Sequence, residues 1–269
     1  MLFLLFRFNR LIPYLCRAKI TQLEKIRVGI VNYLNTRPLI WGLQRPPVSE
    51  LIDLVGDYPA RVAQMLKEGE IDLGLIPVAV IPELPEYHII GKHCIGTEGE
   101  IASVALFSDV PMHEIRKVYL DYQSRTSVEL LRYLMKEYWG ISPEIVQATG
   151  EDYREEIRGT TAGLVIGDWA FEQRKISTFI YDLGSEWRSI TGLPFVFAAW
   201  VSTRPLPEEF IARFDEANGA GLSHIDEIVA ANPYELFDLQ KYYRLHLSYQ
   251  LDERKMKGLE HFLSVLKTS

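Results

Sequence analysis

Short, nearly continuous apolar runs alternate with amphipathic helical segments, and this alternation constrains the fold of the chain more than any other feature. Strands are predicted at 27–31 and 51–55, a helix over 60–68 that Gly69 ends, and a further strand in the apolar run 71–80. Such runs are typical of strands that are buried on both faces. Strand, helix and strand in succession predict an α/β architecture with a parallel sheet.

The middle of the chain repeats this pattern. A strand is predicted at 118–120, then a helix that ends near Gly140, then a strand at 164–166. Thr126 and Glu129 have the spacing of a capping box, which predicts that the helix starts at Thr126. A second α/β block is therefore expected in this region.

The last third of the chain adds one apolar run at 195–201 and then turns helical after Pro207, with breaks near Asn232 and around 248–251. Two α/β blocks followed by a helical tail suit a two-lobed protein with a ligand between the lobes. Periodicity alone leaves open whether the tail returns to the first lobe.

Charge and hydropathy exclude two classes of partner. The chain has 29 basic against 36 acidic residues and a formal net charge of -7, and its basic residues form only scattered pairs. A nucleic-acid partner is not expected, because such proteins carry a clustered basic surface. No apolar run reaches the roughly 20 residues that a membrane-spanning helix needs, so no membrane partner is expected.

The sequence also gives little support for cofactor or metal chemistry. The two cysteines, Cys16 and Cys94, form neither a disulfide framework nor a metal quartet, and they fit a reducing compartment. The six histidines are scattered without metal-ligand spacing. Glycine-rich nucleotide motifs and the hydrolase nucleophile motif are missing, so we expect neither cofactor nor metal.

The first 25 residues are predicted to be an N-terminal extension outside the fold. The apolar start is shorter than a signal-peptide core, and its arginines follow the apolar segment instead of preceding it. Leu15 stands before Cys16, where a lipoprotein signal requires a small residue. We therefore expect the fold to begin near Lys25.

Three polar clusters follow predicted strands, where ligands bind in open α/β sheets. They are 32–37 (NYLNTR), 124–127 (SRTS) and the pair Gly167 and Asp168. Each could be an ordinary polar turn or helix cap. Alternatively, amides and hydroxyls could bind a small polar ligand at the first cluster, and a helix N-terminus could bind a carboxylate or phosphate at the second.

Several segments, taken in order, resemble the chorismate dehydratases of the futalosine route to menaquinone. The likeness extends from Ile26 to the C-terminus. Single segments are weak signals, but this number in one order is specific. They are 28–39 (VGIVNYLNTRPL), 57–61 (DYPAR), 69–77 (GEIDLGLIP), 94–96 (CIG), 103–108 (SVALFS), 124–127 (SRTS), 166–168 (IGD) and 191–200 (TGLPFVFAAW).

The resemblance implies a type 2 periplasmic-binding-protein-like fold, with two α/β lobes that hinge strands join and a ligand cleft between them. The implied division is 26–104 for the first part of lobe I, 105–197 for lobe II, and 198–269 for the return strand and C-terminal helices of lobe I. It also implies a cytoplasmic hydro-lyase that needs no cofactor. Such an enzyme converts chorismate to 3-[(1-carboxyvinyl)oxy]benzoate and water.

By position in the family motifs, the resemblance assigns the catalytic roles to Asn35 and Ser103. Asn35 would orient the substrate and stabilise developing charge, since an amide is no general base. The proton from C3 would go to a substrate carboxylate, most plausibly the enolpyruvyl one, which Ser103 would help to place.

Four further residues are predicted to bind substrate. Thr126 and Ser127, with Ser124 nearby, would bind a carboxylate at a helix N-terminus. Asp168 would either accept a hydrogen bond from the substrate hydroxyl or cap its own helix. Both roles remain open for Asp168.

The chain departs from the family pattern at 99–102, where Glu100 introduces a carboxylate that we expect near the anionic substrate. Two alternative functions also stay open. One is the sister enzyme of the pathway, 1,4-dihydroxy-6-naphthoate synthase, although its opening segment differs from 32–38. The other is a solute-binding protein that feeds a transporter. A non-catalytic regulatory sensor is a weaker alternative, since no DNA-binding or output module is recognisable.

Overall fold

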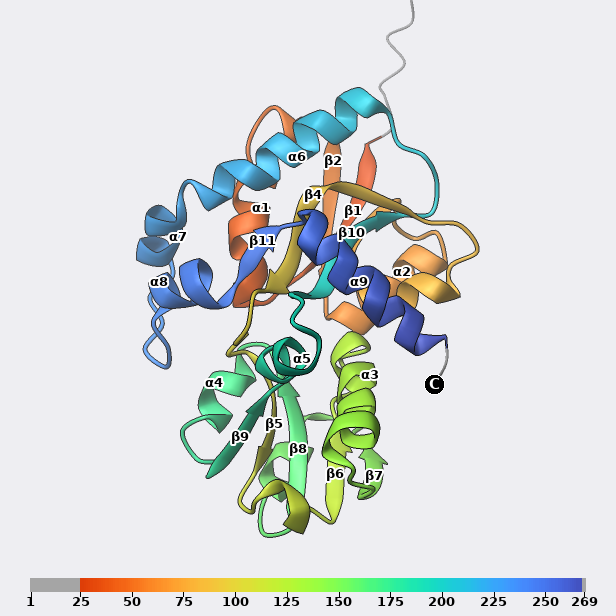
Figure 1. The fold of residues 1–269 in the computed structure, drawn as a ribbon. Helices are drawn as coiled ribbons and strands as arrows, with labels where there is room; N and C mark the ends of the chain where they lie inside the picture. Colours follow the sequence, from red (N-terminus) through yellow and green to blue (C-terminus); the bar gives the residue numbers. More distant parts are fainter. Residues whose placement is uncertain (1–24, 268–269) are drawn as a thin grey trace, which may run out of the picture.

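The computed structural model describes residues 25–267 and shows two lobes, each built around one sheet (Figure 1). We name the lobe with the six-stranded sheet lobe I and the lobe with the five-stranded sheet lobe II. The two α/β lobes predicted from the sequence are confirmed. The predicted extension 1–25 lies, except for Lys25, outside the described residues.

The sheet of lobe I has the strand order β11-β4-β10-β3-β1-β2. Strands β1, β2 and β3 run parallel, whereas β10 pairs antiparallel with both β3 and β4. The strands are β1 (Ile26–Val31), β2 (Ile52–Asp57), β3 (Leu73–Pro77), β4 (His88–Thr97), β10 (Phe195–Ser202) and β11 (Ser248–Gln250). Strand β10 therefore returns to lobe I and lies between two strands from the first third of the chain.

The helices of lobe I cover both faces of this sheet and include the whole C-terminal tail (Figure 1). They are η1 (Leu34–Thr36), α1 (Arg37–Leu43), η2 (Val48–Glu50), α2 (Pro59–Lys67), η3 (Val78–Glu83), α6 (Glu208–Leu222), α7 (Ile225–Ala231), α8 (Leu239–Lys241), η7 (Tyr242–His246) and α9 (Glu253–Leu266). The break expected around 248–251 is strand β11, which pairs with β4. The tail thus returns to lobe I, which periodicity left open.

Lobe II has the strand order β7-β6-β8-β5-β9. Its strands are β5 (Val104–Ser108), β6 (Lys117–Leu120), β7 (Glu144–Gln147), β8 (Thr161–Ile166) and β9 (Phe179–Asp182). Its helices are η4 (Met112–Glu114), α3 (Thr126–Tyr133), η5 (Leu134–Trp139), η6 (Glu151–Glu156), α4 (Trp169–Gln173) and α5 (Leu183–Thr191). The middle α/β block of the sequence forms most of this lobe.

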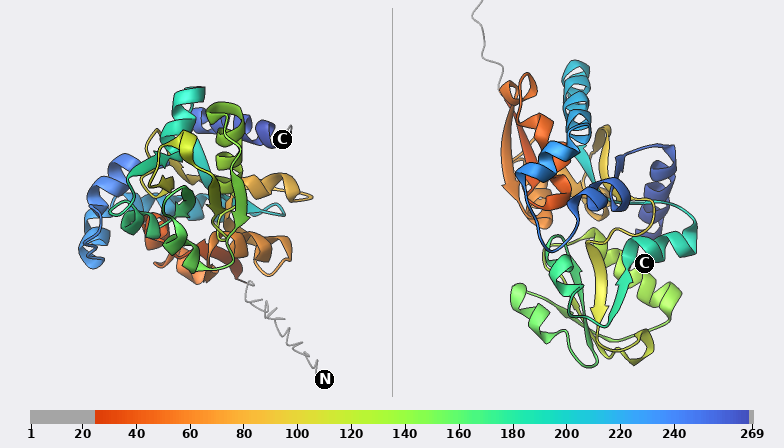
Figure 2. Two further views of the ribbon diagram at one scale, coloured as in Figure 1. Left: turned by 90° about the horizontal axis from the view of Figure 1, so that it is seen from below. Right: turned by 90° about the vertical axis from the view of Figure 1, so that its left-hand side faces the viewer.

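The chain crosses between the lobes twice. The first crossing lies between the end of β4 at Thr97 and the start of β5 at Val104, and the second lies between the end of β9 at Asp182 and the start of β10 at Phe195. Figure 2 shows these crossings between the upper and lower sheets, with α9 beside α5. The division at 104 and 197 stays a prediction, although the sheets change at nearby residues.

Helices α1 and α6 pack at very short distance, and this contact supports the turn η1 that precedes α1. A methyl group added at Gly42 would lie 1.9 Å from the carbonyl oxygen of Ala217, and one added at Gly221 would lie 1.7 Å from that of Pro38. Only glycine permits such an approach of two backbones. The start of α1, and with it Asn35, is therefore fixed against the helical tail.

Candidate active site

A small cavity lies between the two lobes, and its walls come from both. Lobe I contributes the end of β1, the turn η1 and parts of β3 and β10, and lobe II contributes the start of β5, the end of β8 and the start of α3. Its volume, measured as the space open to the centres of water molecules, is about 60 Å³, which is enough for several waters. The polar side chains in its lining belong to Tyr33, Asn35, Thr36, Ser124, Thr126 and Ser127.

Charge is missing from this lining. Among the residues that the structure describes, no lysine, arginine, aspartate or glutamate lines the cavity. A bound anion would therefore depend on hydroxyls, amides and main-chain N–H groups. Backbone donors at helix N-termini can provide such a site without a cationic side chain.

Asn35 lies in the lining, as its predicted role requires. It stands in η1 directly after β1, and its main-chain carbonyl accepts a hydrogen bond from the Tyr249 hydroxyl at 2.9 Å. Its carboxamide oxygen Oδ1 is buried and has no hydrogen-bond partner within residues 25–267. A buried acceptor without a partner is costly, so this oxygen is suited to a donor on a ligand.

The turn that carries Asn35 is held by its neighbour. The Thr36 hydroxyl lies 2.5 Å from the carbonyl oxygen of Val31 and 2.8 Å from that of Tyr33. These hydrogen bonds fold the chain back onto the C-terminal end of β1, just before η1 begins. The Asn35 side chain is therefore presented on a short and well-supported turn.

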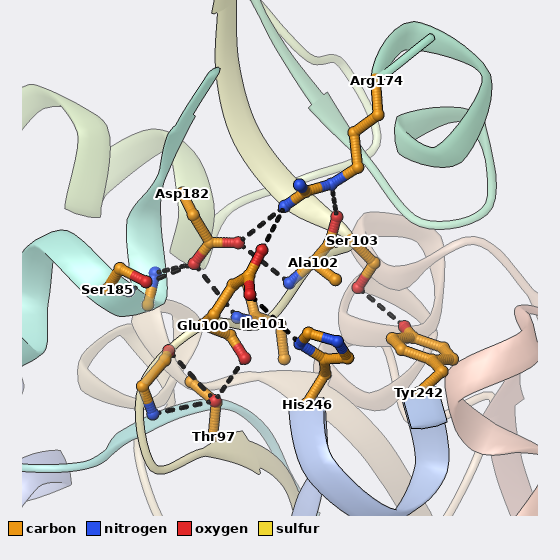
Figure 3. Close-up of polar contacts among 12 residues, drawn as sticks. Thr97, Glu100, Ile101, Ala102, Ser103, Arg174, Asp182, Ser185, Tyr242 and His246 are labelled. Atoms are coloured by element: carbon orange, nitrogen blue, oxygen red, sulfur yellow. Dashed lines mark hydrogen bonds and ion pairs between the residues drawn. The ribbon is translucent and has the colours of Figure 1, made fainter. Parts of the chain in front are cut away.

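Ser103 lies beside the cavity but is not part of its lining. It is fully buried at the first crossing, and the next residue, Val104, lines the cavity. The Ser103 hydroxyl forms a hydrogen bond of 2.7 Å with the Tyr242 hydroxyl (Figure 3), and its carbonyl accepts from the Gly167 N–H at 2.9 Å. The structure thus connects Ser103 to both lobes.

Ser124, Thr126 and Ser127 meet at the start of α3, and all three line the cavity. The predicted helix start at Thr126 is confirmed, but the predicted capping box is wrong. Thr126 is the first residue of the helix, and the Ser124 hydroxyl accepts from the Ser127 N–H at 3.2 Å instead. The cap comes from Ser124 because the Thr126 hydroxyl is engaged with lobe I.

The Thr126 hydroxyl links the two lobes. It donates to the carbonyl oxygen of Phe197 at 2.9 Å and accepts from the Ala79 N–H at 3.2 Å. Both partners belong to lobe I, whereas Thr126 belongs to lobe II. In this closed arrangement Thr126 therefore has a structural role in addition to lining the cavity.

Asp168 is engaged with the other lobe in this structure, and its predicted hydrogen bond to the substrate hydroxyl stays a prediction. Its carboxylate does not cap α4, and it is not in the cavity lining. Instead it accepts from the main-chain N–H of Leu34 at 3.1 Å (Oδ1) and 3.3 Å (Oδ2). Burial raises the pKa of Asp168 to about 6, and the Leu34 N–H and the charge of Arg37 only partly oppose this rise.

Three further contacts hold the lobes together, and the sequence did not indicate any of them. The Tyr33 hydroxyl donates to the side-chain oxygen of Gln123, whose main-chain carbonyl accepts from the Ala60 N–H at 3.1 Å. Gly167 lies against the Tyr33 ring, where an added methyl group would be 3.2 Å away. Tyr33 and Gln123 were visible only as members of polar turns.

Glu100 does not contribute to the cavity lining, contrary to the expectation of a carboxylate beside the substrate. Figure 3 shows it at the first crossing, between Arg174 and His246. Its carboxylate lies 3.2 Å from the Arg174 guanidinium and 3.6 Å from Nδ1 of His246. The charge of Glu100 is therefore balanced outside the cavity.

The same cluster fixes the backbone just before Ser103. The buried carboxylate of Asp182 accepts from the N–H groups of Ile101 at 3.0 Å and Ala102 at 2.8 Å, and it pairs with Arg174 at 3.1 Å (Figure 3). Ala102 has a left-handed φ of 65°, which is unfavourable for an alanine. These bonds stabilise that conformation at the entrance to lobe II.

Two kinds of feature are absent from the described part of the chain. No cluster of histidine, cysteine, aspartate and glutamate in residues 25–267 could hold a metal ion. No helix in the same range is long and apolar enough to cross a membrane.

Two α/β lobes, two chain crossings and a cavity between the lobes define a protein of the periplasmic-binding-protein-like class. An Archaeoglobus fulgidus protein of known structure is similar in fold, with a TM-score of 0.74, 14% identity, and coverage of 91% of this chain and 97% of the other. The alkanesulfonate-binding protein of Xanthomonas axonopodis pv. citri is also similar, with a TM-score of 0.64, 14% identity, and coverage of 91% and 92%. At these identities the likeness shows the fold alone.

Within this class, the chain belongs to the menaquinone biosynthesis family, whose model matches residues 26–268. A chorismate dehydratase of Thermus thermophilus is 27% identical over 262 residues, which cover 89% of this chain and 94% of that protein. The resemblance to chorismate dehydratases that the sequence motifs indicated is confirmed.

Proposed function

We propose that this protein is a chorismate dehydratase of the futalosine route to menaquinone. It converts chorismate to 3-[(1-carboxyvinyl)oxy]benzoate and water, as a cytoplasmic carbon–oxygen lyase that uses no cofactor. Membership of the menaquinone biosynthesis family and the similarity to the Thermus enzyme support this assignment. The buried, unpaired thiol of Cys94 suits a reducing compartment.

One observation carries the catalytic part of the proposal, namely the buried carboxamide oxygen of Asn35. It belongs to the lining of a cavity between the lobes and has no partner in the described chain. Chorismate has a hydroxyl at C4 that can donate to this oxygen. The amide would then hold the departing hydroxyl in place.

The reaction breaks two bonds of the substrate and moves one proton. The C3–H bond breaks and its electron pair forms the new ring double bond, while the C4–O bond breaks and the hydroxyl leaves. The C3 proton goes to a carboxylate of the substrate itself, the enolpyruvyl one, and that carboxylic acid then gives the same proton to the departing hydroxyl, so that water leaves. Aromatisation provides the driving force, so positioning and fixed dipoles can supply the catalysis.

Ser103 would help to place the carboxylate that takes the proton. Its hydroxyl is buried at the first crossing, one residue before a residue of the cavity lining. A hydroxyl in a site without bulk water is a strong donor to a carboxylate. Asn35 and Ser103 would therefore have separate roles. Asn35 would orient the leaving hydroxyl, and Ser103 would orient the carboxylate that accepts the proton.

A carboxylate of the substrate would bind at the start of α3. The helix begins at Thr126, and Ser124, Thr126 and Ser127 all face the cavity. The first N–H groups of a helix and its dipole favour an anion. This fits a cavity that no cationic side chain lines within residues 25–267.

Closure of the lobes would keep water out of the reaction. The Thr126 contacts with Phe197 and Ala79, and the Tyr33 contact with Gln123, hold the two lobes together around the cavity. Substrate would enter when these contacts open. Exclusion of water then strengthens each polar contact with the substrate.

The test is to incubate the purified protein with chorismate and no added cofactor, and to follow the products by chromatography and mass spectrometry. We expect an aromatic product that is lighter than chorismate by one water and absent without the protein. If chorismate binds but is not consumed, the dehydratase assignment is wrong and a solute-binding role replaces it. Turnover of cyclic dehypoxanthinyl futalosine in place of chorismate would identify the sister enzyme.

A further inference from the structure

Two buried tyrosines of the C-terminal tail contact the two residues to which we assign catalysis. The Tyr242 hydroxyl lies 2.7 Å from the Ser103 hydroxyl, and the Tyr249 hydroxyl donates to the Asn35 carbonyl at 2.9 Å. These pairs are 139 and 214 residues apart in the sequence. One short segment, from η7 to β11, therefore reaches both residues.

The relative acidities of the two hydroxyls set the direction of the hydrogen bond between Tyr242 and Ser103. A phenol is a stronger acid than an aliphatic alcohol, so Tyr242 donates and Ser103 accepts. Burial holds the pKa of Tyr242 well above its usual value, which keeps the phenol neutral and able to donate. The proton of the Ser103 hydroxyl then remains available for a carboxylate.

Tyr249 acts on the backbone of the first catalytic turn. The Asn35 carbonyl can only accept, so the tyrosine hydroxyl is the donor. Strand β11, which carries Tyr249, pairs with β4 on the sheet of lobe I. This contact ties η1 to a rigid element and limits the orientations open to the Asn35 side chain.

Packing alone does not explain these two contacts. Tyr243 follows Tyr242 directly and is only 1% exposed, yet its hydroxyl has no hydrogen-bond partner in residues 25–267. A buried tyrosine in this segment is thus accommodated without a bond to the site. The bonds of Tyr242 and Tyr249 are specific to Ser103 and Asn35.

We infer that Tyr242 and Tyr249 are positioning residues of the active site, Tyr242 acting through Ser103 and Tyr249 through Asn35. This inference rests on the proposed function. The C-terminal tail then has two roles, because it packs on the sheet of lobe I and also positions the two catalytic residues. Neither residue touches the reacting atoms.

The experiment compares Tyr242→Phe, Tyr249→Phe and the control Tyr243→Phe with the wild type in the chorismate assay, with kcat, KM and melting temperature measured for each. Each positioning variant should lose about tenfold in kcat with KM within about twofold, the effect of one lost hydrogen bond at a positioned group. The control removes the same atom from the same segment and should keep wild-type kcat.

A double-mutant cycle then separates positioning from general stability. In a Ser103→Ala background, Tyr242→Phe should have no further effect on kcat, because its partner is already gone. A full additional loss in that background would overturn the inference for Tyr242. An equal loss of kcat in Tyr243→Phe would assign the effect to packing and overturn it for both tyrosines.

Wild-type activity distinguishes the two levels of the proposal. An active wild type with unchanged Tyr242→Phe and Tyr249→Phe enzymes would refute the positioning roles and leave the dehydratase intact. A wild type that does not dehydrate chorismate would refute the proposed function, and the positioning roles with it.

Discussion

The carboxylate of Asp168 in lobe II accepts a hydrogen bond from the main-chain N–H of Leu34 in lobe I, at 3.1 Å. Leu34 directly precedes Asn35, so a side chain of one lobe holds the turn that carries the principal site residue of the other. The main-chain carbonyl of Asp168 also accepts a hydrogen bond from the Tyr234 hydroxyl at 3.3 Å. Closure of the lobes and the placement of Asn35 are therefore coupled through this residue.

The ionisation of Asp168 should make stability depend on pH. Burial raises its pKa from 3.8 to about 6, so the folded protein holds this proton more tightly than the unfolded chain does. Between these values the folded state binds more protons, and its stability decreases as pH rises. The contribution of Asp168 should therefore fall by about 2 kcal/mol from pH 4 to pH 7.

Asp168→Asn provides the measurement. The amide oxygen can still accept from the Leu34 N–H, but it does not titrate. Urea unfolding at pH 4, 5, 6 and 7 should show the variant gaining stability relative to the wild type as pH rises. A stability difference that stays constant over this range would show that the pKa of Asp168 is not raised.

Asn35→Ala should reduce turnover far more than binding. We expect kcat to fall about 100-fold or more, with a small change in KM, because the amide oxygen orients the leaving hydroxyl as the C4–O bond breaks. Asn32→Ala is the matched control, since Asn32 belongs to the same polar turn but is exposed and outside the cavity lining. An Asn35→Ala enzyme as active as this control would refute the role of Asn35.

The double variant Thr126→Ala with Ser127→Ala should chiefly weaken substrate binding. The variant loses the Ser127 hydroxyl from the cavity lining and also the Thr126 hydroxyl, whose bonds to Phe197 and Ala79 hold the lobes together, so we expect KM for chorismate to rise about tenfold or more. Thr126→Ser with Ser127→Thr keeps both hydroxyls and serves as the control. If the alanine variant kept its KM, the helix N-terminus would not be the carboxylate site.

Several strands and helices of the two α/β blocks could be predicted because their apolar residues follow the periods of buried strands and amphipathic helices, whereas β5, β7, β9, α4 and α5 of lobe II were not predicted. The strand predicted at 27–31 is β1 at Ile26–Val31, and that predicted at 195–201 is β10 at Phe195–Ser202. Strand β11 was missed because three residues are too short for a periodic pattern. Strand β4 was also missed, since Gly91, Lys92 and His93 interrupt its apolar run.

Local patterns indicated which polar turns form the site, but they could not show the contacts that join the lobes. Asn35 and the start of α3 lie where strands end, which is why they could be proposed. The hydroxyl of Thr126 has the spacing of a helix cap, but Phe197 and Ala79 from the other lobe engage it. Tyr242 and Tyr249 gave no signal, because their partners are far away in the sequence.

The contact between α1 and α6 leads to a prediction about stability. A methyl group at Gly221 would lie 1.7 Å from the Pro38 carbonyl oxygen, so Gly221→Ala must push the two helices apart. We expect a loss of about 2–3 kcal/mol in the free energy of unfolding, measured with urea. Since η1 leads directly into α1, the shift should also displace Asn35 and lower kcat.

Gly219→Ala is the control on the same helix. There an added methyl group would lie 3.6 Å from the His93 ring, which is an ordinary contact, so this variant should be as stable as the wild type or gain up to about 1 kcal/mol. Equal stability of the two alanine variants would show that α1 and α6 do not approach so closely in solution. A destabilised Gly221→Ala protein with unchanged kcat would show instead that Asn35 is held by its turn and by Tyr249, independently of α6.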